Sequence, residues 1–317
     1  MRLFHGTDNA DIARPTVLTL GVFDGLHLGH QAIIRTVVDR ARAVGAAATV
    51  LTFEPHPRSV LHPESAPPLL QTFDQKVEAL GVLGVDQTIV IHFNKAFALT
   101  PAADFLRDIV RERLHAKEVY LGRGFAFGHN REGNINLLRS VSAELGFYAD
   151  EVPEVRLRGT RIGSTRIREL LQQGRINLAR RMLGRPYGVE GRVIHGARRG
   201  GQLGFPTANI QPHNRVIPRG GVYVTAALID KQWRRSVTNI GTRPTFDDST
   251  DTSIETHVIN LSDDLYGNVV RVRFLHRLRD ERKFGSLDEL RTQIHCDVSR
   301  AKRFFERAGV KRSLKIV

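Results

Sequence analysis

The sequence predicts an α/β protein with two domains: an N-terminal parallel sheet covered by helices, and a small C-terminal antiparallel β-barrel with a terminal helix. Apolar β-rich runs alternate with segments of helical periodicity over the first half of the chain, which is typical of βαβ units. From residue 188 the segments become short, strand-like and punctuated by Gly, Pro, Asn and Asp. A chain of 317 residues also favours two domains. We place the boundary near Gly184, which gives domains 1–183 and 184–317.

Hydrophobic patterning predicts the N-terminal elements in order. A strand that ends in a glycine turn is expected at 16–25, and a helix stopped by a glycine at 30–45. A second strand at 47–57 is halted by two prolines. The helix expected at 100–114 has Thr100 as its cap and Pro101 at its first position. The remaining elements are a helix at 74–84, strands at 85–93 and 116–128, and a fifth strand at 152–157.

The C-terminal half reads as a series of short strands followed by one long helix. Strands are expected at 188–196, 220–230, 232–241, 253–261 and 268–280. The helix at 286–309 opens with Ser286, and Glu289 follows three residues later, which is the pattern of a capping box. This succession predicts the barrel and its terminal helix.

Composition narrows the class of partner. The formal net charge of +14 indicates anionic partners, such as nucleic acid, nucleotides or anionic lipid, or else a basic solvated surface. Lys and Arg are scattered, aromatics are 7% of the chain, and no nucleic-acid-binding module is visible, so we expect no specific nucleic acid. A single cysteine, Cys296, excludes a disulfide framework and a cysteine-built zinc site. Without an N-terminal signal sequence or a run of membrane-spanning length, we expect a cytoplasmic protein and no membrane.

The stretch "GVFDGLHLGH" joins the first strand to the first helix. Helix N-termini expose unpaired N–H groups and bind anions, most often phosphate. Gly21 and Gly25 let the backbone turn tightly and approach a ligand, while His27 and His30 lie about one turn apart on one side. Two imidazoles there can donate hydrogen bonds to phosphate oxygens. A metal site is the competing interpretation, but no third soft ligand lies nearby in the sequence.

The stretch "RIGSTRIREL" at 161–170 is a second candidate for phosphate contact. Ser164 and Thr165 can cap a helix and meet phosphate, and Arg168 can add charge-assisted hydrogen bonds. Taken alone, the stretch is also what an ordinary capped helix start looks like.

The stretch "GFPTAN" at 204–209 brings a glycine, a proline, a hydroxyl and an amide into one turn. Thr207 and Asn209 alternate, so they face the same way along an extended segment. Such oxygen ligands suit Mg²⁺ carried on a nucleotide phosphate, although a polar loop is the simpler reading of this stretch alone. Farther on, Glu255 lies in a strand-like run, where it either points to solvent or faces a pocket as a base.

These motifs together resemble two known families. "GVFDGLHLGH" is similar to the HxGH signature of the nucleotidylyltransferase superfamily, and with "TFEPHPR" and "GSTRIREL" it resembles an FMN adenylyltransferase module. The segments "GRPY", "GRVIHG", "RGGQLGFPTANI", "GVYV", "NIGTRPTF", "ETHV", "DLYG" and "LRDERKFGSLDELRTQI" resemble riboflavin kinase in its family order. The chain therefore resembles the bacterial bifunctional riboflavin kinase/FAD synthetases over roughly residues 16 to 305.

The resemblance implies a fold and two reactions. A Rossmann-like nucleotidylyltransferase domain would join FMN to AMP from ATP, giving FAD and pyrophosphate. A riboflavin kinase-like barrel would phosphorylate riboflavin with MgATP, giving FMN and ADP. Glu255 would be the general base, and Thr207 and Asn209 would hold Mg²⁺. Flavins would be substrate and product, with no tightly bound organic cofactor. The residues implied to bind ATP or its phosphates are Gly21, Phe23, His27, Gly29, His30, Ser164, Thr165, Arg168, Gly204, Thr207 and Asn209.

The sequence departs from the family pattern in the loop "LGRGFAFG" at 121–128. Gly124 stands where the family has Asp or Asn, Ala126 replaces a polar or basic residue, and Gly163 replaces the first Ser of "SSTRIR". Gly124, Phe125 and Phe127 are expected to lie in the flavin-binding loop. A side chain that could hydrogen-bond the flavin or adenine is missing, at a cost of about 1 kcal/mol. The alternative is therefore a riboflavin kinase with a weak or repurposed N-terminal domain; a basic nucleic-acid-binding protein is a further alternative.

Overall fold

The computed structural model describes residues 1–7, 15–196, 203–244, 250–261 and 263–307. The chain forms two compact units, Met1–Ser164 and Thr165–Val317, and each is described by itself. Helix α6 (Ser164–Gln172) begins at the division between them, so the structure groups it with the second unit. The sequence-based boundary near Gly184 lies farther along the chain and stays a prediction.

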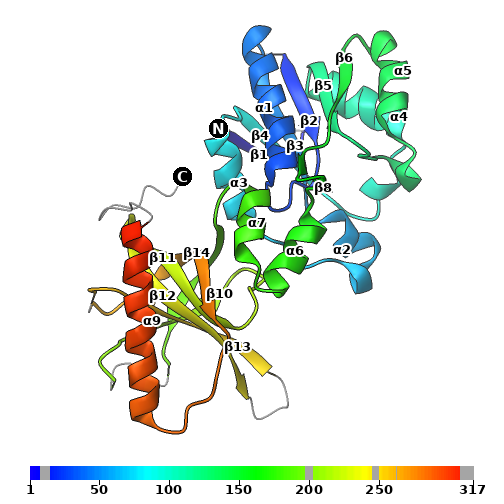
Figure 1. The fold of residues 1–317 in the computed structure, drawn as a ribbon. Helices are drawn as coiled ribbons and strands as arrows, with labels where there is room; N and C mark the ends of the chain where they lie inside the picture. Colours follow the sequence, from blue (N-terminus) through cyan, green and yellow to red (C-terminus); the bar gives the residue numbers. More distant parts are fainter. Residues whose placement is uncertain (8–14, 197–202, 245–249, 262, 308–317) are drawn as a thin grey trace. The chain divides into compact units, whose positions relative to one another are not determined.

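The first unit is built on a six-stranded sheet in the order β1-β4-β3-β2-β5-β6, in which every neighbouring pair is parallel (Figure 1). This arrangement confirms the predicted parallel sheet. The sequence reading missed the edge strand β1. The strands are β1 (Arg2–His5), β2 (Thr16–Leu20), β3 (Ala47–Glu54), β4 (Gln87–His92), β5 (Ala116–Gly122) and β6 (Tyr148–Val152).

Helices cover both faces of this sheet. On one face, α1 packs Ile34, Val37 and Ala41 against strand residues, and α3 adds Leu80. On the other face, the η3 segment and α5 pack Leu106 and Leu138. The helical segments of this unit are α1 (Leu28–Ala43), α2 (Pro57–Leu61), η1 (Pro63–Ser65), α3 (Phe73–Val82), η2 (Phe97–Leu99), α4 (Ala102–Asp104), the π-helix η3 (Phe105–Arg113), η4 (His129–Arg131) and α5 (Ile135–Leu145).

The sheet order indicates where a ligand would bind. Strands β3 and β4 lie on one side of β2, whereas β5 and β6 lie on the other, so the strand order reverses at β2. Open parallel sheets bind ligands outside the carboxyl ends of the strands at such a reversal. The glycine-rich turn that follows β2 lies at this edge.

Two sequence expectations in this unit are wrong. The fifth parallel strand is β6 at Tyr148–Val152, not 152–157; residues 156–157 form β7 (Arg156–Leu157), which pairs antiparallel with β8 (Thr160–Arg161). Thr100 does not cap the following helix, because that helix begins at Ala102 with Pro101 as its N-cap. The Glu132 carboxylate accepts the Ala102 N–H at 2.7 Å instead, so a distant side chain supplies the cap that a local pattern suggested.

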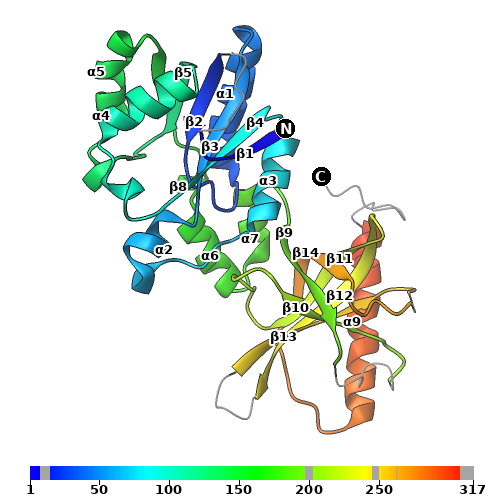
Figure 2. The ribbon, with the colours of Figure 1, turned by 180° about the vertical axis from the view of Figure 1, so that it is seen from behind.

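The second unit contains a closed antiparallel barrel in the order β10-β13-β12-β11-β14-β9 (Figure 2). Its closure confirms the predicted barrel. The elements of this unit are α7 (Ile176–Leu183), β9 (Tyr187–Ile194), β10 (Ala208–Pro212), β11 (Gly221–Ile229), β12 (Gln232–Pro244), β13 (Thr250–Val258), β14 (Val269–Arg279) and α9 (Leu287–Arg307).

Strand alternation separates an inner and an outer face of the barrel. Val222, Val224 and Ala226 of β11 pack with Ala301 and Phe305 of α9, so these even-numbered side chains face outward onto the terminal helix. Between them, the hydroxyl of Thr225 hydrogen-bonds to those of Ser236 and Thr238, and Thr238 bonds to Thr256. These four hydroxyl groups are buried and satisfy one another inside the barrel.

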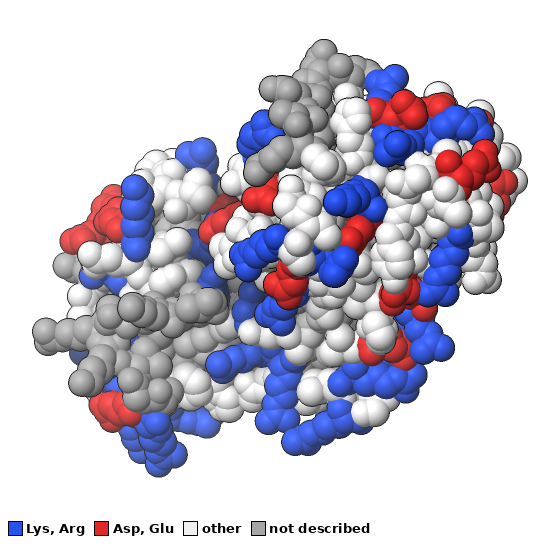
Figure 3. All heavy atoms as spheres, turned by 90° about the horizontal axis from the view of Figure 1, so that it is seen from above, with Lys and Arg blue, Asp and Glu red and all other residues white. Residues whose placement is uncertain are grey.

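The start of α9 agrees in part with the predicted capping box. The Ser286 hydroxyl accepts the Glu289 N–H at 3.2 Å, as expected. The Glu289 carboxylate accepts the N–H of Gly285, one residue before the cap position that a capping box would use. On the surface, Lys and Arg side chains are spread over the face seen in Figure 3, with fewer Asp and Glu side chains among them.

Candidate functional sites

The turn between β2 and α1 has a backbone that few sequences can adopt. Phe23, Gly25 and Leu26 all have positive φ angles, of 53°, 82° and 41°. Such angles are unfavourable for residues other than glycine, and they gather at functional sites where surrounding structure holds them. A Cβ at Gly25 would also lie 2.6 Å from Cδ1 of the buried Leu70, so that side chain would have to move. The surrounding structure therefore holds this turn in an unfavourable backbone conformation.

His27 and His30 lie together at the N-terminus of α1. His27 is the N-cap, and its Nδ1 accepts the backbone N–H of His30 at 3.3 Å. Accepting this bond leaves the proton of a neutral His27 ring on Nε2, where it can be donated to an anion. The two rings stack with centroids 3.7 Å apart, and Phe23 meets the His30 ring edge-on at 5.3 Å. Gly29 allows this stack, since a Cβ there would lie 3.2 Å from the His27 ring.

Asp24 ties this turn to two other segments. Its carboxylate accepts the Leu70 N–H at 2.9 Å, and its backbone carbonyl accepts the Ser164 hydroxyl at 2.8 Å. The side-chain amide of Gln71 donates to the carbonyl of Phe23. These bonds favour a turn-stabilising role for Asp24. They also place Ser164, a predicted phosphate contact, directly against the histidine-bearing turn.

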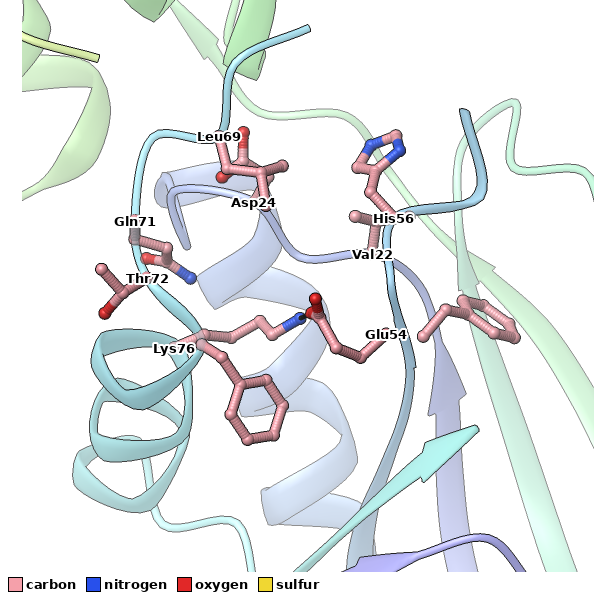
Figure 4. Close-up of a pocket in the computed structure, with 10 residues that line it drawn as sticks. Val22, Asp24, Glu54, His56, Leu69, Gln71, Thr72 and Lys76 are labelled. Atoms are coloured by element: carbon pink, nitrogen blue, oxygen red, sulfur yellow. Dashed lines mark ion pairs between the residues drawn. The ribbon is translucent and has the colours of Figure 1, made fainter. Parts of the chain in front are cut away.

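A pocket opens beside the turn at the carboxyl ends of β2 and β3 (Figure 4). Asp24, Glu54 and Lys76 are charged residues of its lining; Lys76 points toward Glu54, and Asp24 lies apart from this pair, near Leu69. The pocket is lined by Val22, Asp24, Phe53, Glu54, His56, Leu69, Gln71, Thr72, Phe73 and Lys76. It lies where the topology of the sheet predicts a ligand site.

The remaining predicted residues of the first site fall in α6 and in the loop after β5. Thr165 and Arg168 belong to α6 in the second unit, where Arg168 is about nine-tenths buried. A Cβ at Gly163 would meet no described atom within 4 Å, so a serine would fit.

The loop after β5 contains the three residues expected to contact flavin. Gly124 has a φ of 73°, a Cβ there would meet nothing described within 4 Å, and its N–H donates to Glu151 at 3.3 Å. Phe127 is buried in the hydrophobic core with Phe105, while Phe125 is partly buried against that core. Phe127 therefore has the environment of a core residue, and its predicted contact with flavin stays a prediction.

The barrel brings together two of the residues predicted for the second site, Asn209 and Glu255. Asn209 on β10 lies directly opposite Glu255 on β13, and Glu255 lies opposite Asn239 on β12. Directly opposed residues of antiparallel strands project from the same face with Cβ atoms about 5 Å apart. Asn239 of β12 lies opposite Val222 of β11, which faces outward onto α9. Asn239, Glu255 and Asn209 therefore lie on the outer face of the barrel. The Ser253 hydroxyl donates to Glu255 at 3.1 Å.

Thr207 comes just before β10 on a segment that β13 holds in place. The side chain of His257, two residues after Glu255, has Nδ1 at 2.8 Å from the Pro206 carbonyl, which can only accept a hydrogen bond. The ring of Phe205 meets His257 edge-on at 5.5 Å. Gly204 has a φ of 84°, and a Cβ there would meet no described atom within 4 Å. Parts of "RGGQLGFPTANI" and "NIGTRPTF" lie outside the described residues.

Three residues of these sites were missed from the sequence: Lys76, Asn239 and His257. Lys76 carried a usable signal, because it lies four residues before Leu80 and so on the buried face of α3. Asn239 and His257 become recognisable only from the register of β12 and β13, which the sequence does not reveal.

The described ranges also bear on metal sites and on membrane-spanning segments. No group of three or more His, Cys, Asp or Glu side chains there could hold a metal ion. Among those same residues, no helix combines the length and the apolar character that crossing a bilayer requires.

Comparisons with known proteins match both halves of the chain. The sequence model of the FAD synthetase family matches residues 9–166, and that of riboflavin kinase matches residues 183–305. The chain is 39% identical to the bifunctional riboflavin kinase/FMN adenylyltransferase of Haemophilus influenzae, with 96% of this chain and 99% of that protein covered. The proteins of the same name from Pseudomonas fluorescens and Escherichia coli are 38% and 35% identical; these matches cover 95% and 96% of this chain, and 97% and 98% of those proteins.

A solved structure is similar over nearly the whole fold. A crystal structure titled as a macrolide-efflux protein from Streptococcus pneumoniae has a TM-score of 0.88 and 29% identity to this chain. The match covers 95% of this chain and 99% of that one. Both units are therefore present in that structure as well.

Proposed function

The chain belongs to the family of bifunctional riboflavin kinase/FMN adenylyltransferases, and we propose that it carries out both reactions, phosphorylating riboflavin to FMN and then adenylylating FMN to FAD. The relatives that carry this double name match along nearly all of the chain, so a riboflavin kinase with a repurposed N-terminal domain is the less favoured reading.

The observation that carries the kinase proposal is the register of the barrel, which sets Asn209 directly opposite Glu255. The Glu255 carboxylate takes the proton of the riboflavin 5′-hydroxyl as that oxygen attacks the γ-phosphorus of ATP, and ADP leaves. Ser253 orients the carboxylate through its hydrogen bond. Holding the hydroxyl and the phosphate on neighbouring strands supplies the alignment that phosphoryl transfer requires.

The residues beside Glu255 fit a hard divalent cation. The Thr207 hydroxyl and the Asn209 amide oxygen are neutral oxygen donors of the kind that Mg²⁺ takes when nucleotide phosphates complete its shell. Asn209 packs so closely against Gly196 that a Cβ there would overlap the amide group, which holds this side chain in place. We propose Mg²⁺ as this ion, which would neutralise charge on the phosphates.

Adenylyl transfer is assigned to the turn at the start of α1. His27 donates from Nε2, and with His30 and the N–H groups of the first helical turn it stabilises the negative charge on the ATP phosphates. A phosphate oxygen of FMN attacks the α-phosphorus of ATP, and pyrophosphate leaves. Ser164 holds the turn through Asp24, and Thr165 and Arg168 are proposed as further phosphate contacts.

The proposed small-molecule partners are riboflavin, FMN and ATP as substrates, with ADP, pyrophosphate and FAD as products. Since these molecules are mostly anions, they give the net charge of +14 an explanation that needs no specific nucleic acid.

Following FMN and FAD by chromatography tests the proposal. The protein is incubated with riboflavin, ATP and Mg²⁺, and FMN is expected first, then FAD. Glu255→Gln should abolish FMN formation but still convert added FMN to FAD. His30→Ala should do the reverse. FMN that accumulates without FAD in the unaltered protein would show that the N-terminal domain has other chemistry, and absence of both products would overturn the whole assignment.

A further inference from the structure

Lys76 is a buried charge at the edge of the proposed adenylyl-transfer site. Its side chain is only 7% exposed, although lysine is rarely buried unless it is paired. The ammonium donates to the Thr52 hydroxyl at 3.4 Å, lies 4.0 Å from Glu54 and is 5.5 Å from the centre of the Phe73 ring (Figure 4). Helix α3 thus directs a cation to the carboxyl end of β3.

Asp24 supplies a second negative charge to the same pocket, and it is also buried. Burial lowers the pKa of Lys76, while the carboxylates of Glu54 and Asp24 raise it. Glu54 is the closer carboxylate, at 4.0 Å, and Asp24 lines the same pocket at a greater distance from the ammonium (Figure 4). Two acids and one buried cation share the space beside a turn that is proposed to receive polyphosphate.

This arrangement answers an electrostatic problem. Asp24 must keep a hydrogen-bond acceptor to bind the Leu70 N–H. Together with the bond from the Gln71 amide to the Phe23 carbonyl, this bond fixes the turn to the segment before α3. An uncompensated carboxylate in that turn would repel the nucleotide phosphates bound at His27 and His30. A buried cation on α3 removes the repulsion and leaves the hydrogen bonds intact.

We propose that Lys76 is a positioning residue for adenylyl transfer, whose ammonium neutralises Asp24 and Glu54 and so allows the Asp24 turn to hold its shape beside bound polyphosphate. The proposal rests on the proposed function of the N-terminal unit. It differs from a direct role, in which Lys76 itself binds substrate, and from a purely structural role, in which Lys76 only stabilises the fold.

A charge-pair experiment separates these roles. The conversion of FMN and ATP to FAD is measured for Lys76→Met, Lys76→Arg, Asp24→Asn and the double variant Lys76→Met/Asp24→Asn. Lys95→Met, which removes an exposed lysine of the same unit, is the matched control. Phosphorylation of riboflavin by the same preparations reports whether the chain is intact, since that reaction is assigned to the barrel.

The expected result is a rise of about tenfold or more in the KM for ATP of Lys76→Met, with a smaller change in kcat. Lys76→Arg keeps the charge and should stay within a few-fold of the unaltered protein. The double variant should recover most of the loss, because the amide introduced by Asp24→Asn still accepts from Leu70 but carries no charge to repel phosphate.

Several results would overturn the proposal. Failure of Asp24→Asn to rescue Lys76→Met would indicate direct binding by Lys76. A lowered unfolding temperature with unchanged kinetic constants would indicate a structural role. If Lys76→Met does not fold, Asp24→Asn alone decides, because a higher KM for ATP in that variant contradicts the repulsion argument. A protein that makes FMN but no FAD refutes the proposed function and this proposal together, whereas normal kinetics in Lys76→Met refutes this proposal alone.

Discussion

His27 caps α1, and its proposed second role is to donate a hydrogen bond to phosphate; substitution can separate the two. We predict that His27→Asn and His27→Ala both slow FAD formation by about 10²- to 10³-fold, because each removes the imidazole that faces the developing charge. Asn is a good N-cap and Ala is not, so only His27→Ala should lose about 1 kcal/mol of stability. For a unit that spans Met1–Ser164, this loss corresponds to about 2–4 °C in the unfolding temperature.

The assay must report the first unit alone. The only tryptophan of the chain, Trp233, lies on β12, so its fluorescence follows the barrel and should be unchanged in both variants. Amide hydrogen exchange over residues 28–43 follows α1 and should be faster only in His27→Ala. An FAD rate near that of the unaltered protein in His27→Asn would refute the phosphate role. Equal exchange in the two variants would refute the capping role.

Three further predictions concern other parts of the chain. Gly124→Asn should fold, because Asn tolerates the φ of 73° and a Cβ has open space there. By restoring one hydrogen bond, it should lower the KM for FMN about fivefold. An unchanged KM in steady-state kinetics would count against this prediction. His257→Leu should slow FMN formation about 3- to 10-fold, because the hydrogen bond to Pro206 is lost. His257→Asn should retain more activity than His257→Leu, and FAD formation from added FMN should not change. Equal rates of FMN formation in the two variants would be evidence against a loop-holding role. Glu118 accepts two hydrogen bonds from Arg40, which lower its pKa, so its stabilisation is complete above the ordinary carboxyl pKa and disappears as the pH falls through the lowered value. Glu118→Gln should therefore be less stable than the unaltered protein by about 1–2 kcal/mol at pH 7. Urea unfolding at several pH values should show this difference in stability shrinking below about pH 4. A difference that stays constant with pH would be inconsistent with a role for the ionised carboxylate.

Much of the fold follows from local pattern because its strands and helices are long and regular. The run at β2 is buried at every position, and α1 repeats its apolar residues at helical spacing. The predictions that failed concern residues whose structure depends on partners far away along the chain. Residues 152–157 have the pattern of an extended segment, yet the backbone pairs with β5 a few residues earlier, at 148–152. Thr100 matches a cap, but Glu132, which lies 30 residues from Ala102 along the chain, takes the Ala102 N–H.

The candidate sites show the same division. Sequence spacing sufficed for His27 and His30, because they are neighbours on one helix turn. It could not place Glu255 beside Asn209, since these residues are far apart along the chain and only strand register brings them together. Lys76 was missed although its spacing from Leu80 places it on the buried face of α3, because a lone lysine in an amphipathic helix is normally solvated.

The closed barrel also limits how the length of this chain can change. Side chains alternate between the two faces of a strand, so one inserted residue before Glu255 within β13 would turn that carboxylate to the interior, among the buried hydroxyls. A closed sheet cannot absorb such a slip at an edge, because every strand is paired on both sides. Strand β14 already takes up extra residues as irregularities in its pairing with β11. Changes in length that preserve kinase activity are therefore expected in the connections between strands or at such bulges, and not before Asn209 in β10 or Glu255 in β13.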